Sequence, residues 1–124
     1  MSVAILRQGD YLIASIQTDL SDGEVLTLRD QLSELVGRHR ARGLIVDVAA
    51  LDVIDSFVAR ALRAIAVTAR LRGAETIVVG VRPDVAIAMV QFRLNLEPLR
   101  AALDLDAAKV ILLRRTQGDA LDER

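Results

Sequence analysis

Two short apolar runs that each lead into a helical pattern constrain the fold of this chain most strongly. The runs lie at residues 44–48 (LIVDV) and 76–79 (TIVV), and such near-continuous apolar runs are typical of strands buried on both faces. Residues 56–71 and the segment that begins at Gly80 then carry apolar side chains at helical spacing. Strands that alternate with helices pair in parallel through right-handed crossovers, so the sequence predicts an α/β domain with helices packed on a mostly parallel sheet.

The N-terminal part predicts an antiparallel hairpin followed by a helix. Apolar runs at 3–7 and 11–17 flank a turn-like Gln-Gly-Asp sequence, which is typical of paired antiparallel strands. Ser21 and Glu24 then have the spacing of a capping box, in which each side chain bonds the backbone of the other residue. A helix is therefore expected to follow Ser21 and to exit at Gly43.

The C-terminal part predicts a short edge strand at residues 99–103 and a last helix. Asp104 can cap this helix, which is expected to run to about Arg115. Residues 116–124 are expected to form a disordered tail. The prediction is thus a single domain at residues 1–115, with a mixed, mostly parallel sheet, an N-terminal hairpin and about four helices.

The composition disfavours several classes of function. The 124 residues include no cysteine, which removes disulfides, thiolate catalysis and cysteine-ligated zinc. A net charge of −1 and an aromatic content of only 2% disfavour nucleic acid as a partner. No uncharged stretch approaches the roughly 18 residues of a membrane span, and the N-terminus has no signal-peptide pattern. We therefore expect a cytoplasmic protein with no membrane partner.

Ser56 stands where a loop meets the second helical pattern, and three roles are open to it. It can cap the helix, because serine is a favoured N-cap residue. It can act as a nucleophile, but the only histidine, His39, lies among arginines whose charge disfavours proton uptake. No G-x-S-x-G sequence surrounds Ser56 either, so a serine hydrolase is disfavoured. The third role, acceptance of a phosphate group, stays open beside that of a cap.

Three aspartates near this point form a second candidate site. Asp47, Asp52 and Asp55 could make an acidic cluster for a metal ion or for phosphate transfer. The alternative is structural, because Asp47 falls inside a strand pattern while Asp52 and Asp55 occupy positions where turn and cap residues are favoured. No glycine-rich phosphate-binding motif accompanies them. We expect neither a metal nor a cofactor.

Two arginines favour the phosphate-acceptor role of Ser56. Arg60 and Arg63 follow it at i+4 and i+7, on the same outward stripe of the predicted helix. A phosphate group on Ser56 would meet free amides at the helix N-terminus and could pair with Arg60 one turn on. Phe57 either joins the core or contacts a partner, so modification of Ser56 could be coupled to binding.

Two stretches of the sequence resemble STAS domains, the family of sulfate transporters and anti-sigma factor antagonists. They are residues 43–57 (GLIVDVAALDVIDSF) and 78–90 (VVGVRPDVAIAMV), and the likeness extends from Val3 to about Leu113. Its most specific part is the Asp-Ser step before the second helix, together with the Gly-Val-Arg-Pro sequence at 80–83.

The resemblance implies a phosphorylation switch without catalysis. Ser56 would be phosphorylated by a partner serine kinase. Asp55 would present the serine, and Phe57, Arg60 and Arg63 would lie at the partner-binding surface. In the RsbS-like branch of the family, the unmodified protein self-associates with RsbR-like STAS proteins in a large complex, the stressosome. This complex holds an RsbT-like serine kinase, and phosphorylation releases it.

The resemblance leaves a second branch of the family open. An anti-sigma factor antagonist would bind an anti-sigma kinase while unphosphorylated and thereby free a sigma factor. Phe57, Val58 and Ala59 stand where many antagonists have glycine or another small residue soon after the serine, which favours the RsbS-like branch. Val79 stands where related chains often carry threonine, so no second phosphorylation site is expected there.

Overall fold

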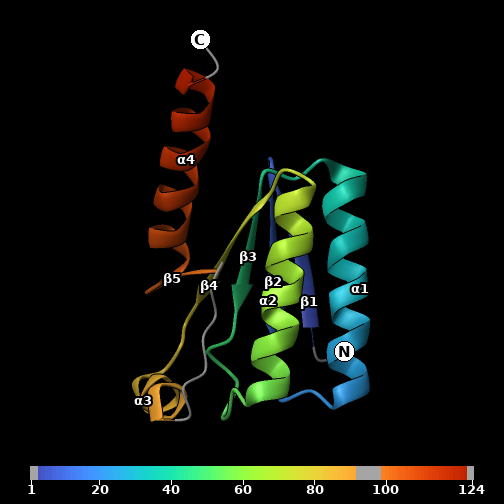
Figure 1. Cartoon of the computed structure of the whole chain (residues 1–124), viewed down its shortest axis with the longest axis vertical. Helices are drawn as coiled ribbons and strands as arrows, with labels where there is room; N and C mark the ends of the chain where they lie inside the picture. Colours follow the sequence, from blue (N-terminus) through green and yellow to red (C-terminus); the bar gives the residue numbers. More distant parts are fainter. Residues whose placement is uncertain (1–2, 92–98, 123–124) are drawn as a thin grey trace.

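The sheet at the centre of the molecule has five strands in the order β1-β2-β3-β4-β5 (Figure 1). The computed structural model describes residues 3–91 and 99–122, apart from the side chains of 115–122. β1 and β2 are antiparallel, and each later pair of neighbours is parallel, which confirms the predicted mixed sheet and N-terminal hairpin. The strands are β1 (Val3–Gln8), β2 (Tyr11–Ile16), β3 (Gly43–Asp47), β4 (Glu75–Val79) and β5 (Arg100–Ala102).

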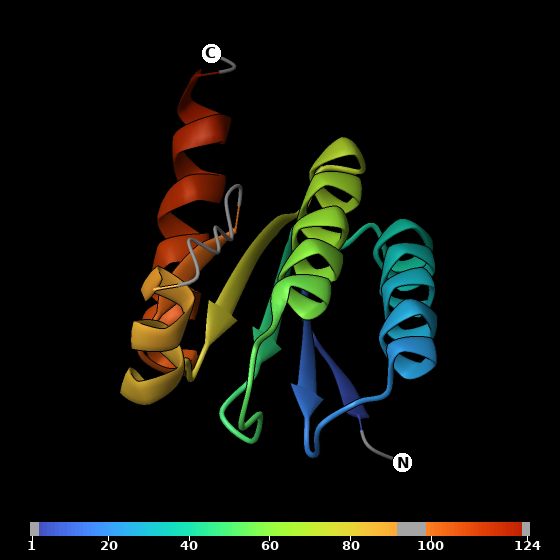
Figure 2. The ribbon, with the colours of Figure 1, turned by 60° about the horizontal axis from the view of Figure 1, so that its bottom comes forward.

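The described residues form four helices, which are α1 (Asp22–His39), α2 (Ser56–Leu71), α3 (Pro83–Gln91) and α4 (Leu105–Asp122). α1 and α2 lie side by side on one face of the sheet, and α4 lies on the other (Figure 2). Both α1 and α2 begin at the edge where the parallel strands end (Figure 1). The loops that enter these two helices are therefore neighbours at that edge.

The core divides into a larger cluster under α1 and α2 and a smaller cluster under α4. On β3, Leu44 and Val46 belong to the larger cluster, and Ile45 between them belongs to the smaller one. β4 repeats this alternation, with Val78 in the larger cluster and its two neighbours in the smaller. Because both faces of these strands are covered, successive residues are apolar, which explains the runs in the sequence.

The predicted helix starts are present. The Glu24 amide donates to Ser21 Oγ at 3.2 Å, and the Ser21 amide donates to Glu24 Oε1 at 3.0 Å, which completes the capping box. At the start of α4, the Ala107 amide donates to Asp104 Oδ1 at 2.9 Å. Pro83 is the first residue of α3, where its fixed φ and missing N–H are tolerated.

The predicted exit of the first helix was wrong. α1 ends at His39, with Arg40 in the left-handed conformation at φ 49°, and Gly43 is the first residue of β3. A side chain at Gly43 would lie 2.7 Å from Leu112 Cδ1 and 3.0 Å from Tyr11 Cδ1. Glycine is therefore needed there so that α4 can pack closely on the sheet, and not to end a helix.

The last helix is longer than predicted. α4 continues past Arg115 to Asp122, so residues 116–122 of the expected tail belong to it. The single glycine in this stretch costs a helix only about 1 kcal/mol, which is too little to end it. β5 covers three residues of the predicted strand at 99–103, and Phe92, which belongs to the apolar pattern that follows Gly80 in the sequence, lies outside the described residues. Within the described ranges, no helix has the length and apolarity to cross a membrane.

Candidate functional site

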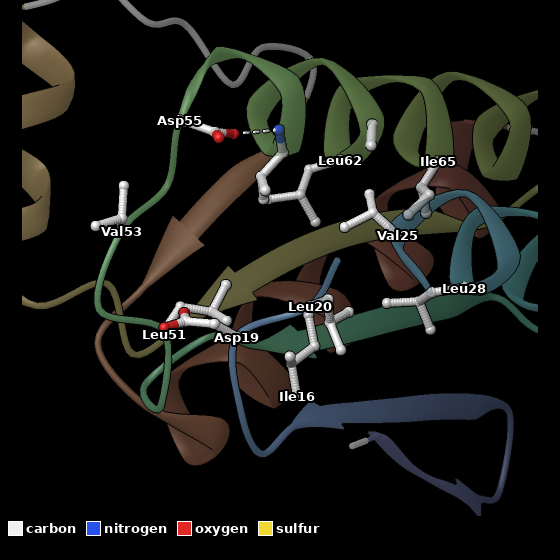
Figure 3. A pocket seen from close by; sticks show the side chains of 12 residues that line it. Ile16, Asp19, Leu20, Val25, Leu28, Leu51, Val53, Asp55, Leu62 and Ile65 are labelled. Atoms are coloured by element: carbon white, nitrogen blue, oxygen red, sulfur yellow. Dashed lines mark hydrogen bonds between the residues drawn. The ribbon is translucent and has the colours of Figure 1, made fainter. Parts of the chain in front are cut away.

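Asp55, and not Ser56, caps the second helix. Asp55 has extended backbone angles, and its Oδ1 accepts a hydrogen bond from the Val58 amide at 2.8 Å (Figure 3). Ser56 is the first helical residue and is exposed. Among the described residues, its hydroxyl has no hydrogen-bond partner. The interpretation of Ser56 as a helix cap was therefore wrong, because its neighbour already fills that position.

The residues that follow Ser56 divide between surface and interior. Arg60 and Arg63 are exposed, as predicted for the outward stripe of α2. Phe57 is half-buried and lines a hollow of about 190 Å³ between α1 and α2, which Leu26 and Arg60 also border. The phenylalanine thus packs toward α1 on one side of the serine.

The loop before Ser56 is held from two directions. The Asp52 amide donates to Asp19 Oδ1 at 3.2 Å, which links this loop to the one that enters α1. On the other side, Arg82 Nη2 donates to the Leu51 carbonyl at 2.9 Å and to Asp52 Oδ1 at 3.0 Å. Hydrogen bonds to distant parts of the chain therefore fix the path of the segment that leads to Ser56.

Gly80 allows the loop that runs from β3 to Ser56 to lie close to the end of β4. Its φ is +81°, a conformation that side chains disfavour. A Cβ at this position would lie 2.8 Å from Ala49 Cβ and 3.0 Å from Asp47 Oδ1. Arg82 follows Gly80 by two residues. The backbone conformation of Gly80 therefore helps to place the Arg82 side chain where it can contact the loop before Ser56.

The three aspartates do not form a common site. Asp47 Oδ1 accepts from the Ala49 amide at 2.9 Å, Asp52 pairs with Arg82, and Asp55 caps α2. Within residues 3–91 and 99–122, no group of three or more acidic, histidine or cysteine residues is arranged to hold a metal ion. The acidic-cluster hypothesis is therefore contradicted in favour of turn, ion-pair and cap roles.

The structure also disfavours nucleophilic catalysis by Ser56. His39 lies in the last turn of α1. That end of α1 is at the opposite edge of the sheet from the start of α2 (Figure 1). The imidazole is thus far from the serine and cannot serve as its base.

A groove of about 570 Å³ opens beside Ser56, between the loop and the start of α3. Val53, Ile54, Val85 and Ala88 supply its apolar surface. Asp52, Asp55 and Asp84 place three carboxylates around it. Val53 is 64% exposed, so its side chain leaves apolar surface open to solvent at this groove.

Comparison with known proteins identifies the family of the chain. A family model described as the STAS domain matches residues 2–108. The chain belongs to the STAS domain family. A search of curated proteins found no match.

Solved structures resemble this STAS domain over nearly its whole length. A serine-to-glutamate variant of RsbS from Moorella thermoacetica is 30% identical, with a TM-score of 0.80, and the match covers 94% of this chain and 99% of that one. A structure of the stressosome, described as a signal integration and transduction hub, is 28% identical, with a TM-score of 0.71, covering 91% and 98%. Unphosphorylated SpoIIAA, an anti-sigma factor antagonist, is 12% identical with a TM-score of 0.67, covering 90% and 97%, and shows the fold alone.

Sequence reasoning singled out Ser56 but missed the contacts that hold the loop before it. The Gly-Val-Arg-Pro sequence at 80–83 was singled out for its resemblance to the family, and no role was assigned to Arg82. Its contacts with Leu51 and Asp52 join the two most specific motifs of the sequence in space. The only signal in the sequence was that both motifs follow buried strands, and parallel strands end at the same edge of a sheet.

Proposed function

We propose that this STAS domain is a non-catalytic stressosome scaffold that binds an RsbT-like serine kinase near Ser56 and releases it when Ser56 is phosphorylated. The observation that carries the proposal is the Ser56 hydroxyl, which is exposed and is freed from capping by Asp55. The similarity to RsbS and to a stressosome structure, each over more than nine-tenths of the chain, supports the same function.

The groove beside Ser56 is the surface that we assign to the kinase. Its apolar residues would be covered by the bound partner, and the serine lies within reach at its border. Phosphorylation adds about −1.5 to −2 charges, which opposes the docking of an apolar or acidic surface. Asp55 and Asp84 already place carboxylates at the groove, so a phosphate would add to the negative charge there.

The fold need not change for the switch to work. A phosphate on Ser56 would lie at the N-terminal end of α2, where free amides and the helix dipole favour an anion. Arg60, one turn along and exposed, could pair with it. Asp55 caps the helix in either state because its hydrogen bond to Val58 does not involve the serine.

RsbR-like STAS proteins and further copies of this chain complete the assembly that we propose, in the cytoplasm. β1 lies at the edge of the sheet, and an edge strand presents backbone donors and acceptors to a neighbouring molecule. The contacts among scaffold subunits would then be separate from the kinase surface at α2, so release of the kinase leaves the scaffold intact.

The test is a pull-down from the source cell with three baits: the wild-type protein, Ser56→Asp and Gln31→Glu. Gln31 is exposed on α1, so Gln31→Glu adds the same charge away from the groove. We expect a small kinase with the wild type and with Gln31→Glu but not with Ser56→Asp, while other STAS proteins remain with all three. Recovery of the same kinase by all three baits would contradict a switch at Ser56.

Light scattering separates the scaffold from an anti-sigma factor antagonist. The scaffold should form a large complex when it is mixed with the STAS proteins that the pull-down recovers. An anti-sigma factor antagonist should stay monomeric or dimeric in that mixture. In the pull-down, it should recover an anti-sigma kinase.

A further inference from the structure

A second cavity lies between α1 and α2, on the inner side of the loop that leads to Ser56 (Figure 3). Its volume is about 150 Å³. Of the twelve residues that line it, ten are apolar and two, Asp19 and Asp55, are acidic. Its inner wall belongs to the core, since Val25, Leu28 and Ile65 are each less than one-tenth exposed.

The two carboxylates lie on the exposed side of this cavity. Asp19 and Asp55 are exposed, as is Val53 beside them, so the cavity opens to solvent between the two loops. Each carboxylate already accepts a backbone amide, Asp19 from Asp52 and Asp55 from Val58. They are therefore fixed in place and make the entrance unfavourable for an anion.

We propose that this cavity binds a small, uncharged, apolar molecule of about the size of benzene. An engineered apolar cavity of about 150 Å³ in another protein stays free of water and binds benzene or xenon. The present cavity has a similar volume and a mostly aliphatic lining, but it opens to solvent, so an apolar ligand would displace water from its apolar walls. Drug-sized ligands, which need roughly 300 Å³ or more, are too large for it.

The ligand would touch the segment that carries the phosphate acceptor. Leu51 and Val53 line the cavity and lie a few residues before Ser56, and Val58 lines it from the first turn of α2. The cavity shares Val53 and Asp55 with the groove assigned to the kinase, but its other lining residues differ, because the loop separates the two. The inference therefore stands or falls independently of phosphorylation at Ser56.

The test is a titration of the purified full chain with benzene, followed by methyl NMR. We expect saturable shifts of the methyl groups of Val25, Leu28 and Ile65. Benzoate, which has the same ring and a negative charge, should shift none of them at the same concentrations. Equal shifts with benzoate, or benzene shifts spread over methyl groups outside the cavity, would overturn the proposal.

Two alanines of α2 provide matched variants. Ala61 lines the cavity and Ala64 does not. Ala61→Leu should fill the space and weaken benzene binding by about ten-fold or more, whereas Ala64→Leu should leave it unchanged. If Ala61→Leu binds benzene as the wild type does, the ligand occupies another place and the proposal is wrong.

A variant that enlarges the cavity keeps the proposal testable if Ala61→Leu does not fold. Val58→Ala removes two methyl groups from the wall. It should allow naphthalene, which is too large for the wild-type cavity, to shift the same methyl groups in a saturable way. Failure of naphthalene to bind Val58→Ala more tightly than the wild type would count against the cavity.

Discussion

α1 and α2 both begin near a serine at the same edge of the sheet, yet the two serines have different environments. Ser21 is itself the N-cap of α1, and its Oγ accepts the Glu24 amide at 3.2 Å. At α2, Asp55 is the cap and accepts the Val58 amide at 2.8 Å, so Ser56 comes one residue later. A serine that caps a helix uses its hydroxyl as a hydrogen-bond acceptor in the fold, whereas the hydroxyl of a serine just after another cap is not used in this way.

The starts of the two helices also differ in the contacts that hold them. The loop before α2 is held from outside by Arg82 and is approached closely by Gly80. The start of α1 is held by its own capping box. Both starts have a local cap, and the loop before α2 is in addition held by the tertiary contacts of Arg82. Four pairs of matched substitutions test this difference.

The largest effect is expected for glycine substitution. Gly80→Ala should lower the free energy of unfolding by about 2 kcal/mol, because φ is +81° and the new Cβ would lie 2.8 Å from Ala49 Cβ. Gly23→Ala, in the first turn of α1, meets no atom within 4 Å and should be neutral or slightly stabilising. Urea unfolding measures both, and a similar loss for the two variants would show that the close approach at Gly80 has no energetic importance.

The next effect concerns binding. Ser56→Asp should weaken the affinity for the kinase by at least about ten-fold, or about 1.4 kcal/mol, because it places charge at the groove. Ser21→Asp adds the same charge at the other helix start and keeps a good N-cap, so affinity should not change. Calorimetric titration with the kinase recovered by the pull-down compares them. Equal weakening by both would point to a general charge effect.

The third effect separates the two serines by stability. Ser21→Ala should cost about 1 kcal/mol, because the amide of Glu24 loses its acceptor. Ser56→Ala should change the free energy of unfolding by less than about 0.5 kcal/mol, since the serine is exposed and Asp55 caps the helix. Thermal and urea unfolding give both values. A larger loss for Ser56→Ala than for Ser21→Ala would reverse the comparison.

These two helix starts also show what sequence can and cannot predict. The capping box of Ser21 was predictable, because both of its residues lie within one turn and have a specific spacing. The bounds of α2 at residues 56–71 were predictable from its apolar face. The choice between Asp55 and Ser56 as the cap was not, since aspartate and serine are about equally favoured there.

Contacts between distant residues were beyond local patterns. Arg82 reaches Leu51 and Asp52 across about thirty residues of sequence, and no spacing rule connects them. Gly43 was interpreted as a helix exit because glycine often follows a helix, but its role depends on Leu112 of α4. In both cases the role of the residue depends on contacts with distant parts of the chain, which local patterns do not contain.

The smallest effect tests the support of the α2 start by Arg82. Arg82→Gln should cost about 0.5 to 1 kcal/mol, because it removes an exposed ion pair and a hydrogen bond to the buried Leu51. Arg29→Gln removes an ion pair of the same length, 3.0 Å, but one confined to adjacent residues of α1, so its effect should be close to zero.

Hydrogen exchange shows whether the lost energy of Arg82→Gln belongs to the loop. The Asp52 amide, which donates to Asp19, should exchange faster in Arg82→Gln, while amides in the middle of α2 keep their rates if only the loop opens locally. Arg29→Gln should leave the Asp52 amide unchanged. If Arg82→Gln alters neither this amide nor stability, then the contacts of Arg82 do not support the start of α2, and the loop is held by Asp19 and Asp55 alone.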